Sequence, residues 1–276
     1  MKGGESVRAA LAAAAARLAA SSGTPRLDAE LLMAEALGSS RETLLLSRLD
    51  DEAPAGFDPL LRRREAGEPI AYIIGRRDFW TISLEVGPGV LVPRPETETL
   101  LDAAVEHFRE GAPARILDLG TGPGTLLLAA LDQWPSATGL GIDASEAALA
   151  YARRNAGRLA LAGRAELRKG DWAAGVEGRF DLVLCNPPYV EQGAALMRDV
   201  AQWEPHAALF AGPDGLADYR RLAPAVPRLL APGGVACFEV GAGQAAAVGA
   251  LLGAEGLSVS PRTDLAGHQR CLVAGR

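Results

Sequence analysis

The chain has 276 residues, of which 49% are hydrophobic and 5% aromatic, and its formal net charge is −6. This length is enough for one or two domains with a sizeable core. The acidic balance argues against a protein that mainly grips nucleic-acid backbones, because such proteins present a basic surface. No stretch approaches the ~20 apolar residues of a membrane span, and the apolar run 11–16 is too short for a signal peptide. We expect a protein without membrane contact.

The three cysteines, Cys185, Cys237 and Cys271, lie far apart in apolar, strand-like runs. They have neither the spacing of a metal site nor the even number of a disulfide framework. The three histidines are not spaced as a ligand pair. We therefore expect no metal and a reducing, cytoplasmic compartment.

Residues 1–68 have the pattern of short amphipathic helices. Thr24-Pro25 is typical of a helix start, and Ser40 can cap the helix that follows it. These residues predict a small N-terminal helical bundle. The bundle contains the basic cluster Arg62-Arg63-Arg64, which is either a solvated face or a surface that docks a partner.

Residues 69–93 change to a strand pattern. An apolar run at 70–74 is followed by strict alternation at Trp80, Ile82, Leu84 and Val86. We interpret the segment as a β-hairpin linker between the bundle and a second domain, residues 94–276.

The second domain begins with the run Pro93-Arg94-Pro95-Glu96-Thr97-Glu98, which leads into a helix. Acidic residues in a first helical turn are favoured by the helix dipole. A role of Arg94 or Glu96 at the mouth of a cofactor site is the alternative, and the sequence does not decide between the two.

From Arg115 strands and helices alternate, which predicts a parallel sheet covered on both faces. The strand 115–119 runs into Gly120-Thr121-Gly122-Pro123-Gly124. A dinucleotide site requires Gly-x-Gly-x-x-Gly, and here the third glycine comes one position early. The turn instead suits a ligand without phosphates, such as S-adenosylmethionine, whose α-amino group would pair with Asp118.

The next two predicted strands also end in polar or aromatic residues. Asp143 follows the strand 137–142, where an acid can hold the two ribose hydroxyls; its alternative role is to cap the next helix. Asp171 and Trp172 follow the strand 165–169. Asp171 can accept from an adenine amine and Trp172 can stack on the ring, although Trp172 can equally be an apolar plug.

The fourth predicted strand, 180–185, ends in Asn186-Pro187-Pro188-Tyr189. The prolines remove two N–H donors, so carbonyl oxygens are left free to accept. Together with the Asn186 amide and the Tyr189 ring, they suit a planar nitrogen such as an amide or an aromatic amine. The alternative is a proline-terminated strand with an asparagine turn. Because the carboxyl ends of parallel strands meet at one edge, all four features should share one crevice.

Three further strands, 234–240, 257–260 and 270–273, close the pattern. With these motifs the chain resembles the HemK/PrmC-type protein-glutamine methyltransferases that modify peptide chain release factors. The similarity covers nearly the whole chain and is most specific at three motifs: Asn186-Pro187-Pro188-Tyr189, Asp118-Leu119-Gly120-Thr121-Gly122, and the run from Val92 to Glu98.

The resemblance implies an α/β fold: a Rossmann-like, seven-stranded class I methyltransferase domain joined by a hairpin to an N-terminal bundle that docks the release factor. It implies a cytoplasmic, monomeric enzyme of translation termination that methylates the glutamine of a Gly-Gly-Gln loop without binding nucleic acid. The S-adenosylmethionine site would comprise Gly120, Thr121, Gly122, Pro123, Gly124, Asp143, Trp172 and Asn186. The glutamine would be held by Asn186, Pro187, Pro188 and Tyr189, with Asn186, Pro187 and Tyr189 as catalytic residues. Pro123 departs from the family pattern, which has a small polar residue there, but removes only one N–H.

Four other functions are compatible with parts of this pattern. They are methylation of an exocyclic amine of DNA or RNA, methylation of a ribosomal-protein glutamine, a non-catalytic S-adenosylmethionine-binding module, and a nicotinamide dehydrogenase. The acidic charge disfavours methylation of DNA or RNA. The intact Asn-Pro-Pro-Tyr motif disfavours a non-catalytic module, and the glycine spacing disfavours a dehydrogenase.

Overall fold

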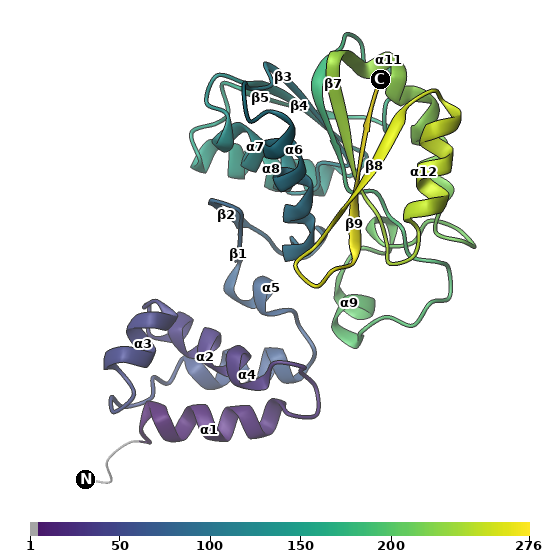
Figure 1. Ribbon diagram of the computed structural model, residues 1–276. Helices are drawn as coiled ribbons and strands as arrows, with labels where there is room; N and C mark the ends of the chain where they lie inside the picture. The colour runs from purple at the N-terminus through teal and green to yellow at the C-terminus, as the bar shows by residue number, and fades with distance from the viewer. Residues whose placement is uncertain (1–4) are drawn as a thin grey trace. The chain divides into compact units, whose positions relative to one another are not determined.

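The computed structural model describes residues 5–276, which form two compact units (Figure 1). The helical unit comprises the chain up to Arg76 together with the later segment Leu196–Trp203. The sheet unit comprises Arg77–Ala195 and Glu204–Arg276. The chain thus leaves the sheet unit after Ala195 and returns to it at Glu204.

The helical unit contains short helices around an aliphatic core. They are α1 (Val7–Leu18), α2 (Pro25–Ala36), α3 (Arg41–Ser47), α4 (Phe57–Glu65), α5 (Ile70–Ile74) and α9 (Arg198–Trp203). Leu11, Leu32 and Leu44 are fully buried between them. The Ser40 hydroxyl accepts from the Thr43 N–H, 3.1 Å away, so the predicted cap of α3 is confirmed.

The basic cluster of α4 is engaged in ion pairs within the helical unit. Arg62 pairs with Asp58 and Arg63 with Glu68. Arg64 is buried, and its Nε lies 2.7 Å from Asp28 Oδ2. The expected solvated face therefore fits Arg62 and Arg63, whose side chains are exposed, whereas Arg64 is part of the buried interior of this unit.

The prediction that residues 70–74 are extended is wrong, because this run forms the helix α5. Pro69 precedes its first turn, and Gly75, with φ of 80°, ends it in the left-handed region. A short apolar run without alternation fits a buried helix as well as a strand, and here the proline and glycine at its ends favour the helix. The hairpin follows as β1 (Arg76–Phe79) and β2 (Ile82–Glu85).

The hairpin is held by helices of the sheet unit. The Trp80 N–H donates to Glu98 Oε1 at 2.8 Å. The Glu85 N–H donates to Asn155 Oδ1 at 2.7 Å, and Asn155 donates back to the Glu85 carbonyl. From Arg77 onward the predicted linker is thus an integral part of the sheet unit.

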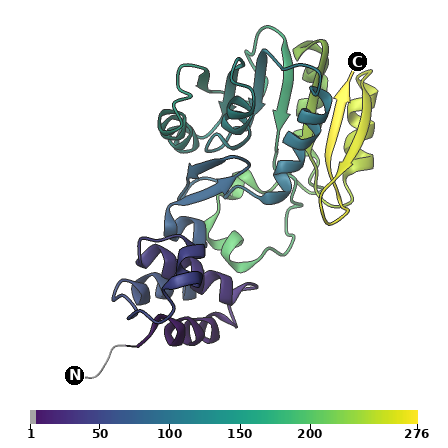
Figure 2. The same ribbon diagram turned by 60° about the vertical axis from the view of Figure 1, so that its left-hand side comes forward.

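Within residues 5–276 the large sheet has seven strands in the order β5-β4-β3-β6-β7-β9-β8, which confirms the expected α/β class (Figures 1 and 2). β9 runs antiparallel to both of its neighbours, β7 and β8, and the other neighbouring strands of this sheet are parallel. The strands are β3 (Arg115–Leu119), β4 (Thr138–Asp143), β5 (Ala165–Lys169), β6 (Phe180–Cys185), β7 (Leu230–Glu239), β8 (Ser258–Thr263) and β9 (Gln269–Gly275).

Helices cover both faces of this sheet (Figure 2). Leu117 and Leu119 of β3 face the larger core, which is completed by α10, α11 and α12. Their neighbours Ile116 and Asp118 point to the other face, where Gly139 and Gly141 of β4 leave room for Leu127 of α7. The helices of this unit are η1 (Pro95–Thr97), α6 (Glu98–His107), α7 (Thr125–Gln133), α8 (Glu146–Arg158), η2 (His206–Ala208), α10 (Ala217–Leu222), η3 (Ala223–Ala225), α11 (Val226–Leu229) and α12 (Ala245–Ala254).

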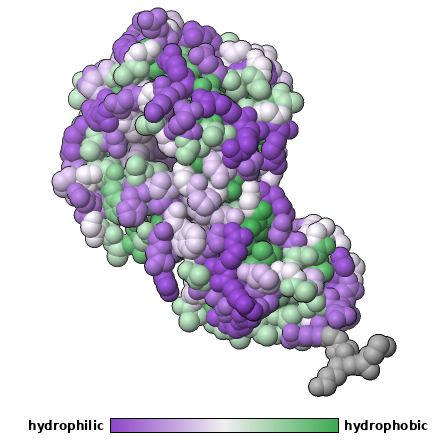
Figure 3. Space-filling model, turned by 180° about the vertical axis from the view of Figure 1, so that it is seen from behind, coloured by the Kyte–Doolittle hydropathy of each residue, from purple (hydrophilic) through white to green (hydrophobic). Residues whose placement is uncertain are grey.

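Among the described residues, no helix is both long and apolar enough to cross a membrane. On the face shown in Figure 3, hydrophilic residues predominate and the hydrophobic ones form small groups between them.

Candidate functional site

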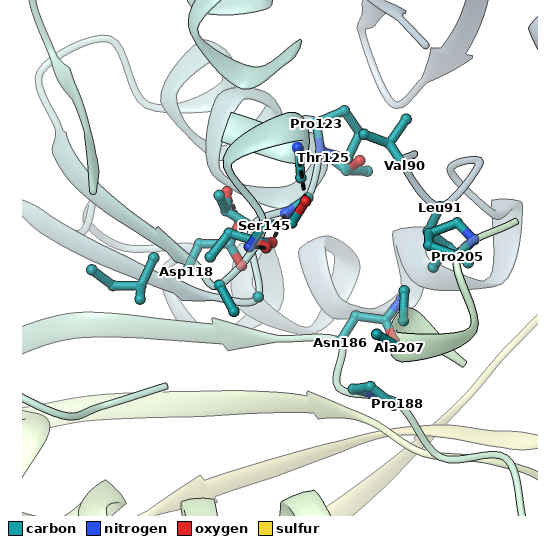
Figure 4. Close-up of a pocket in the computed structure, with 18 of the residues that line it drawn as sticks. Val90, Leu91, Asp118, Pro123, Thr125, Ser145, Asn186, Pro188, Pro205 and Ala207 are labelled. Carbon is teal, nitrogen blue, oxygen red and sulfur yellow. Dashed lines mark hydrogen bonds between the residues drawn. The ribbon is translucent and has the colours of Figure 1, made fainter. Parts of the chain in front are cut away.

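The sheet unit contains a cavity of about 380 Å³ at the carboxyl ends of β3, β4 and β6 (Figure 4). The chain passes from β3 to β4 on one side, whereas β6 lies on the other side of β3. Such a reversal of strand order opens a crevice in which α/β proteins bind ligands. The volume lies in the range of small-molecule sites.

The glycine turn after β3 forms one wall of this cavity. Gly120 has φ of 77°, and an added Cβ would lie 3.0 Å from the Trp172 ring. A side chain at Gly120 would therefore be strained and would also push against the indole. The predicted cofactor residues Gly120, Thr121, Gly122 and Pro123 line the cavity, whereas Gly124 is not among the lining residues.

Asp118 lies at the base of the cavity and is fully buried. Its Oδ2 accepts from the Thr121 hydroxyl at 2.6 Å and from the Leu127 N–H at 3.1 Å. Its Oδ1 has no hydrogen-bond partner within the described part of the chain. Burial raises the pKa of this carboxyl to about 7, although both hydrogen bonds oppose the shift. A buried carboxylate oxygen without a partner suits a cationic ligand group.

Asp143 ends β4 and lines the same cavity. Its Oδ2 accepts from the Gly122 N–H and its Oδ1 from the Ser145 N–H, each at 2.8 Å. These bonds hold the carboxylate still while lone pairs on both oxygens remain available to a ligand. The Ser145 hydroxyl, rather than Asp143, caps α8 through the Ala148 N–H. Burial raises the pKa of Asp143.

Trp172 lines the cavity next to Gly120 of the glycine turn, and its indole is fixed by a residue that the sequence did not single out. The indole Nε1–H donates to Asp218 Oδ1 of α10 at 3.1 Å. The Asp171 carboxylate, which we expected near an adenine amine, pairs with Arg221 at 2.7 Å while also lining the cavity.

Asn186 and Pro188 line the cavity, whereas Pro187 and Tyr189 are not among the lining residues. Figure 4 shows Asn186 and Pro188 near Ala207, apart from Asp118 and Ser145. The Asn186 Nδ2 donates to the Thr97 hydroxyl at 3.3 Å. The Tyr189 hydroxyl donates to Glu239 Oε1 at 3.3 Å, and its ring packs against the larger core. The substrate contacts expected of Pro187 and Tyr189 stay predictions.

Arg94, whose role the sequence left open, lines the cavity and pairs with buried Glu204 at 2.5 Å. The second Glu204 oxygen accepts from the Val92 N–H at 3.1 Å. This carboxylate therefore joins the run before α6 to the segment containing Pro205, Ala207 and Ala208, which forms another part of the wall.

Sequence reasoning missed Thr97, Glu204, Asp218 and Glu239 as residues of the site or its support. Of these, Thr97 carried a signal, because it lies in the run from Val92 to Glu98 that is part of the family resemblance. Within residues 5–276 no group of three or more His, Cys, Asp or Glu side chains is placed to hold a metal ion.

Comparison with known proteins matches both units. A family model described as PrmC N-terminal domain matches residues 9–75, and one described as methyltransferase small domain matches residues 97–204.

The chain is 47% identical to a release factor glutamine methyltransferase of Rhodospirillum rubrum, over 91% of this chain and 79% of the relative. It is 45% identical to one of Caulobacter vibrioides, over 90% of this chain and 89% of the relative. The fold is also similar to that of a methyltransferase from Pyrococcus furiosus, with a TM-score of 0.53 and 19% identity, over 79% of this chain and 98% of the other.

Proposed function

The chain belongs to the family of release factor glutamine methyltransferases, and from this premise we propose how its site performs the reaction. The activity is transfer of a methyl group from S-adenosylmethionine to the side-chain amide nitrogen of a release-factor glutamine. We infer that this glutamine is the one in the Gly-Gly-Gln loop. The observation that carries the assignment of the site is one cavity lined by both the glycine turn and the Asn186 corner.

The residues of the cavity fit S-adenosylmethionine. The unpartnered Asp118 Oδ1 suits its α-ammonium group, and the Asp143 carboxylate suits two ribose hydroxyls. The Trp172 indole offers a flat face to the adenine, and Gly120 lets the backbone come close to the ligand. When bound, the cofactor supplies an electrophilic methyl group on a sulfonium sulfur.

The glutamine amide is a poor nucleophile because its nitrogen lone pair is delocalised into the carbonyl. In our proposal the Asn186 Oδ1 and the Pro187 carbonyl oxygen accept the two amide N–H groups. They orient the nitrogen and stabilise the positive charge that develops on it. Holding two reactants in line can contribute about 7–11 kcal/mol. The nitrogen forms the new bond to carbon, the sulfur–methyl bond breaks, and the nitrogen loses a proton to water or to a carbonyl oxygen.

The helical unit is proposed to dock the release factor, with residues 1–68 as the docking domain and 69–93 as the connection to the catalytic domain, 94–276. Within the basic cluster, buried Arg64 is unavailable for this contact, whereas Arg62 and Arg63 have exposed side chains. Hydrogen exchange of the full chain with and without release factor tests the proposal. Slower exchange in α1–α4 would support it, and protection confined to the sheet unit would contradict it.

The decisive test of the function is tritium transfer from labelled S-adenosylmethionine. The acceptors are a purified release factor, the same factor with its Gly-Gly-Gln glutamine changed to glutamate, ribosomal proteins, DNA and RNA. We expect label only on the unaltered factor, at a glutamine side chain mapped by mass spectrometry. Label on a nucleic acid or on a ribosomal protein, with none on the factor, would overturn the assignment.

A further inference from the structure

Glu239 is a buried carboxylate for which the reaction described above has no use. It is the last residue of β7, its side chain is almost completely inaccessible, and no cation pairs with it among the described residues. Its Oε1 accepts from the Tyr189 hydroxyl at 3.3 Å, whereas Oε2 has no hydrogen-bond partner in residues 5–276. Burial raises the pKa of this carboxyl to about 7. A buried acid with so little compensation costs stability, so its position calls for a functional reason.

Thr97 connects this carboxylate to the cavity. It is buried, it lies in η1 just before α6, and it lines the cavity beside Asn186. Its hydroxyl lies close enough to Glu239 to lower the pKa of that carboxyl. The same hydroxyl oxygen accepts from the Asn186 Nδ2, 3.3 Å away. Thr97 of η1 thus contacts Asn186 of the corner after β6 and lies near the buried Glu239 carboxylate of β7, whose Oε2 has no hydrogen-bond partner in residues 5–276.

The direction of the Thr97 hydroxyl proton follows from the chemistry of the groups next to it. A threonine hydroxyl has one proton, and Glu239, once ionised above about pH 7, can only accept. With its proton directed to Glu239, Thr97 presents lone pairs to Asn186 and can bind only the nitrogen end of the amide. If that proton were free, Thr97 could donate to Asn186 Oδ1 and reverse the carboxamide. A reversed Asn186 would present N–H groups to the substrate's N–H groups, where an acceptor is required.

We propose that Thr97 and Glu239 are positioning residues for the methyl transfer, which hold the Asn186 carboxamide with its Oδ1 directed away from Thr97 and available to the glutamine amide. The inference rests on the proposed role of Asn186 and extends it to two residues that need not contact the substrate. The Tyr219 hydroxyl, which donates to the Glu239 carbonyl oxygen at 2.7 Å, fixes the backbone that carries this carboxylate.

The test compares Thr97→Val with Thr97→Ser in the full-length enzyme, with release factor as methyl acceptor. Valine keeps the shape of threonine and removes the hydroxyl, whereas serine keeps the hydroxyl. We expect Thr97→Val to lower kcat about tenfold, or about 1.4 kcal/mol. KM for the release factor and Kd for S-adenosylmethionine should change less than twofold. Thr97→Ser should retain most of the turnover. Thr99→Val, at another buried threonine two residues away, is the matched control and should leave kcat unchanged.

A double-mutant cycle separates positioning from a general structural effect. If Thr97 acts through Asn186, adding Thr97→Val to Asn186→Ala causes no further loss of kcat. Glu239→Leu gives a second test. If this variant folds, its loss of kcat should resemble that of Thr97→Val, and combining the two substitutions should cause no further loss.

The outcomes distinguish the inference from the function on which it rests. Normal turnover by Asn186→Ala would refute the proposed role of the corner itself. Slow turnover by Asn186→Ala together with normal turnover by Thr97→Val would overturn only the positioning pair. Multiplying losses in the double variant would also overturn it, because Thr97 would then act independently of Asn186.

Discussion

A buried ion pair of the helical unit and two buried carboxylates of the sheet unit differ in how their charge is compensated. In the helical unit, buried Arg64 faces Asp28 at 2.7 Å, and a second carboxylate, Asp199, lies 3.3 Å from it. In the sheet unit, Asp118 at the cavity and Glu239, which does not line it, are as deeply buried, yet each has a carboxylate oxygen without a hydrogen-bond partner within residues 5–276. The first arrangement is complete and serves stability. The second is incomplete, which is expected where a ligand or an oriented hydroxyl group completes the site.

The largest expected effect comes from breaking the complete pair. Arg64→Met removes the cation and leaves Asp28 buried with only the Ser22 and Thr24 hydroxyls as side-chain partners. We expect the free energy of unfolding of the helical unit to fall by about 3–5 kcal/mol. Urea denaturation monitors it, and the double variant Arg64→Met with Asp28→Leu should recover much of the loss. Equal losses in the single and double variants would mean that packing, not charge, dominates.

Asp118→Asn, unlike Arg64→Met, should not lower the stability of the protein, but it should impair the binding of S-adenosylmethionine. It removes a buried charge that has no cation, so the melting temperature should stay the same or rise. It also removes the proposed partner of the cofactor's ammonium group, so Kd for S-adenosylmethionine should rise about 100-fold, or about 2.7 kcal/mol. Isothermal titration measures the affinity. An unchanged Kd would place the ammonium group elsewhere.

Asn186→Ala should impair the reaction rather than binding. We expect turnover to fall by more than tenfold, about 1.4 kcal/mol or more, with the affinity for S-adenosylmethionine largely intact. Single-turnover methylation of release factor measures this, with calorimetry as the check on cofactor binding. Equal losses in both measurements would show that the corner is needed for the cofactor and not specifically for the amide.

The pH dependence of cofactor binding is a smaller effect with a defined sign. The pKa of Asp118 is raised to about 7 in the free protein, and a bound ammonium group favours the ionised carboxylate. Below pH 7 binding must therefore displace a proton, and the affinity should weaken about three- to tenfold from pH 8 to pH 6. Because burial raises the pKa of Asp118, its contribution to the free energy of unfolding is present at low pH, where the carboxyl is protonated. This contribution is lost as pH rises through 7. The pH dependence of the affinity and that of the stability should both be smaller in Asp118→Asn. This variant therefore distinguishes the titration of Asp118 from that of Asp143.

The smallest effect is expected at an exposed ion pair of the helical unit. Arg8 lies 3.0 Å from Asp50, with both side chains largely exposed. Solvent screens such pairs, so Arg8→Ala should move the melting temperature by about 1 °C or less. A larger shift would show that proximity of charges, rather than their burial, governs stability in this unit.

Much of the fold was predictable because it depends on local patterns. Alternating strand and helix signals placed all seven strands of the sheet, and Ser40 was identified as a cap from its position alone. The error at residues 70–74 arose where the pattern was too short to separate helix from strand. Strand order was beyond local pattern, because the insertion of β9 between β7 and β8 depends on which edges pair in space.

The sequence by itself determined the chemistry of the site: a glycine turn after Asp118, an acid at the end of the next strand, and a donor-poor corner beginning at Asn186. These groups can be found from sequence because each immediately follows a strand, and parallel strands end at a common edge. Only the tertiary structure decided which polar groups lack partners and which residues orient Asn186. Thr97 and Glu239 are far apart along the chain and belong to no shared motif, so only folding places Thr97 against the Asn186 amide and near Glu239.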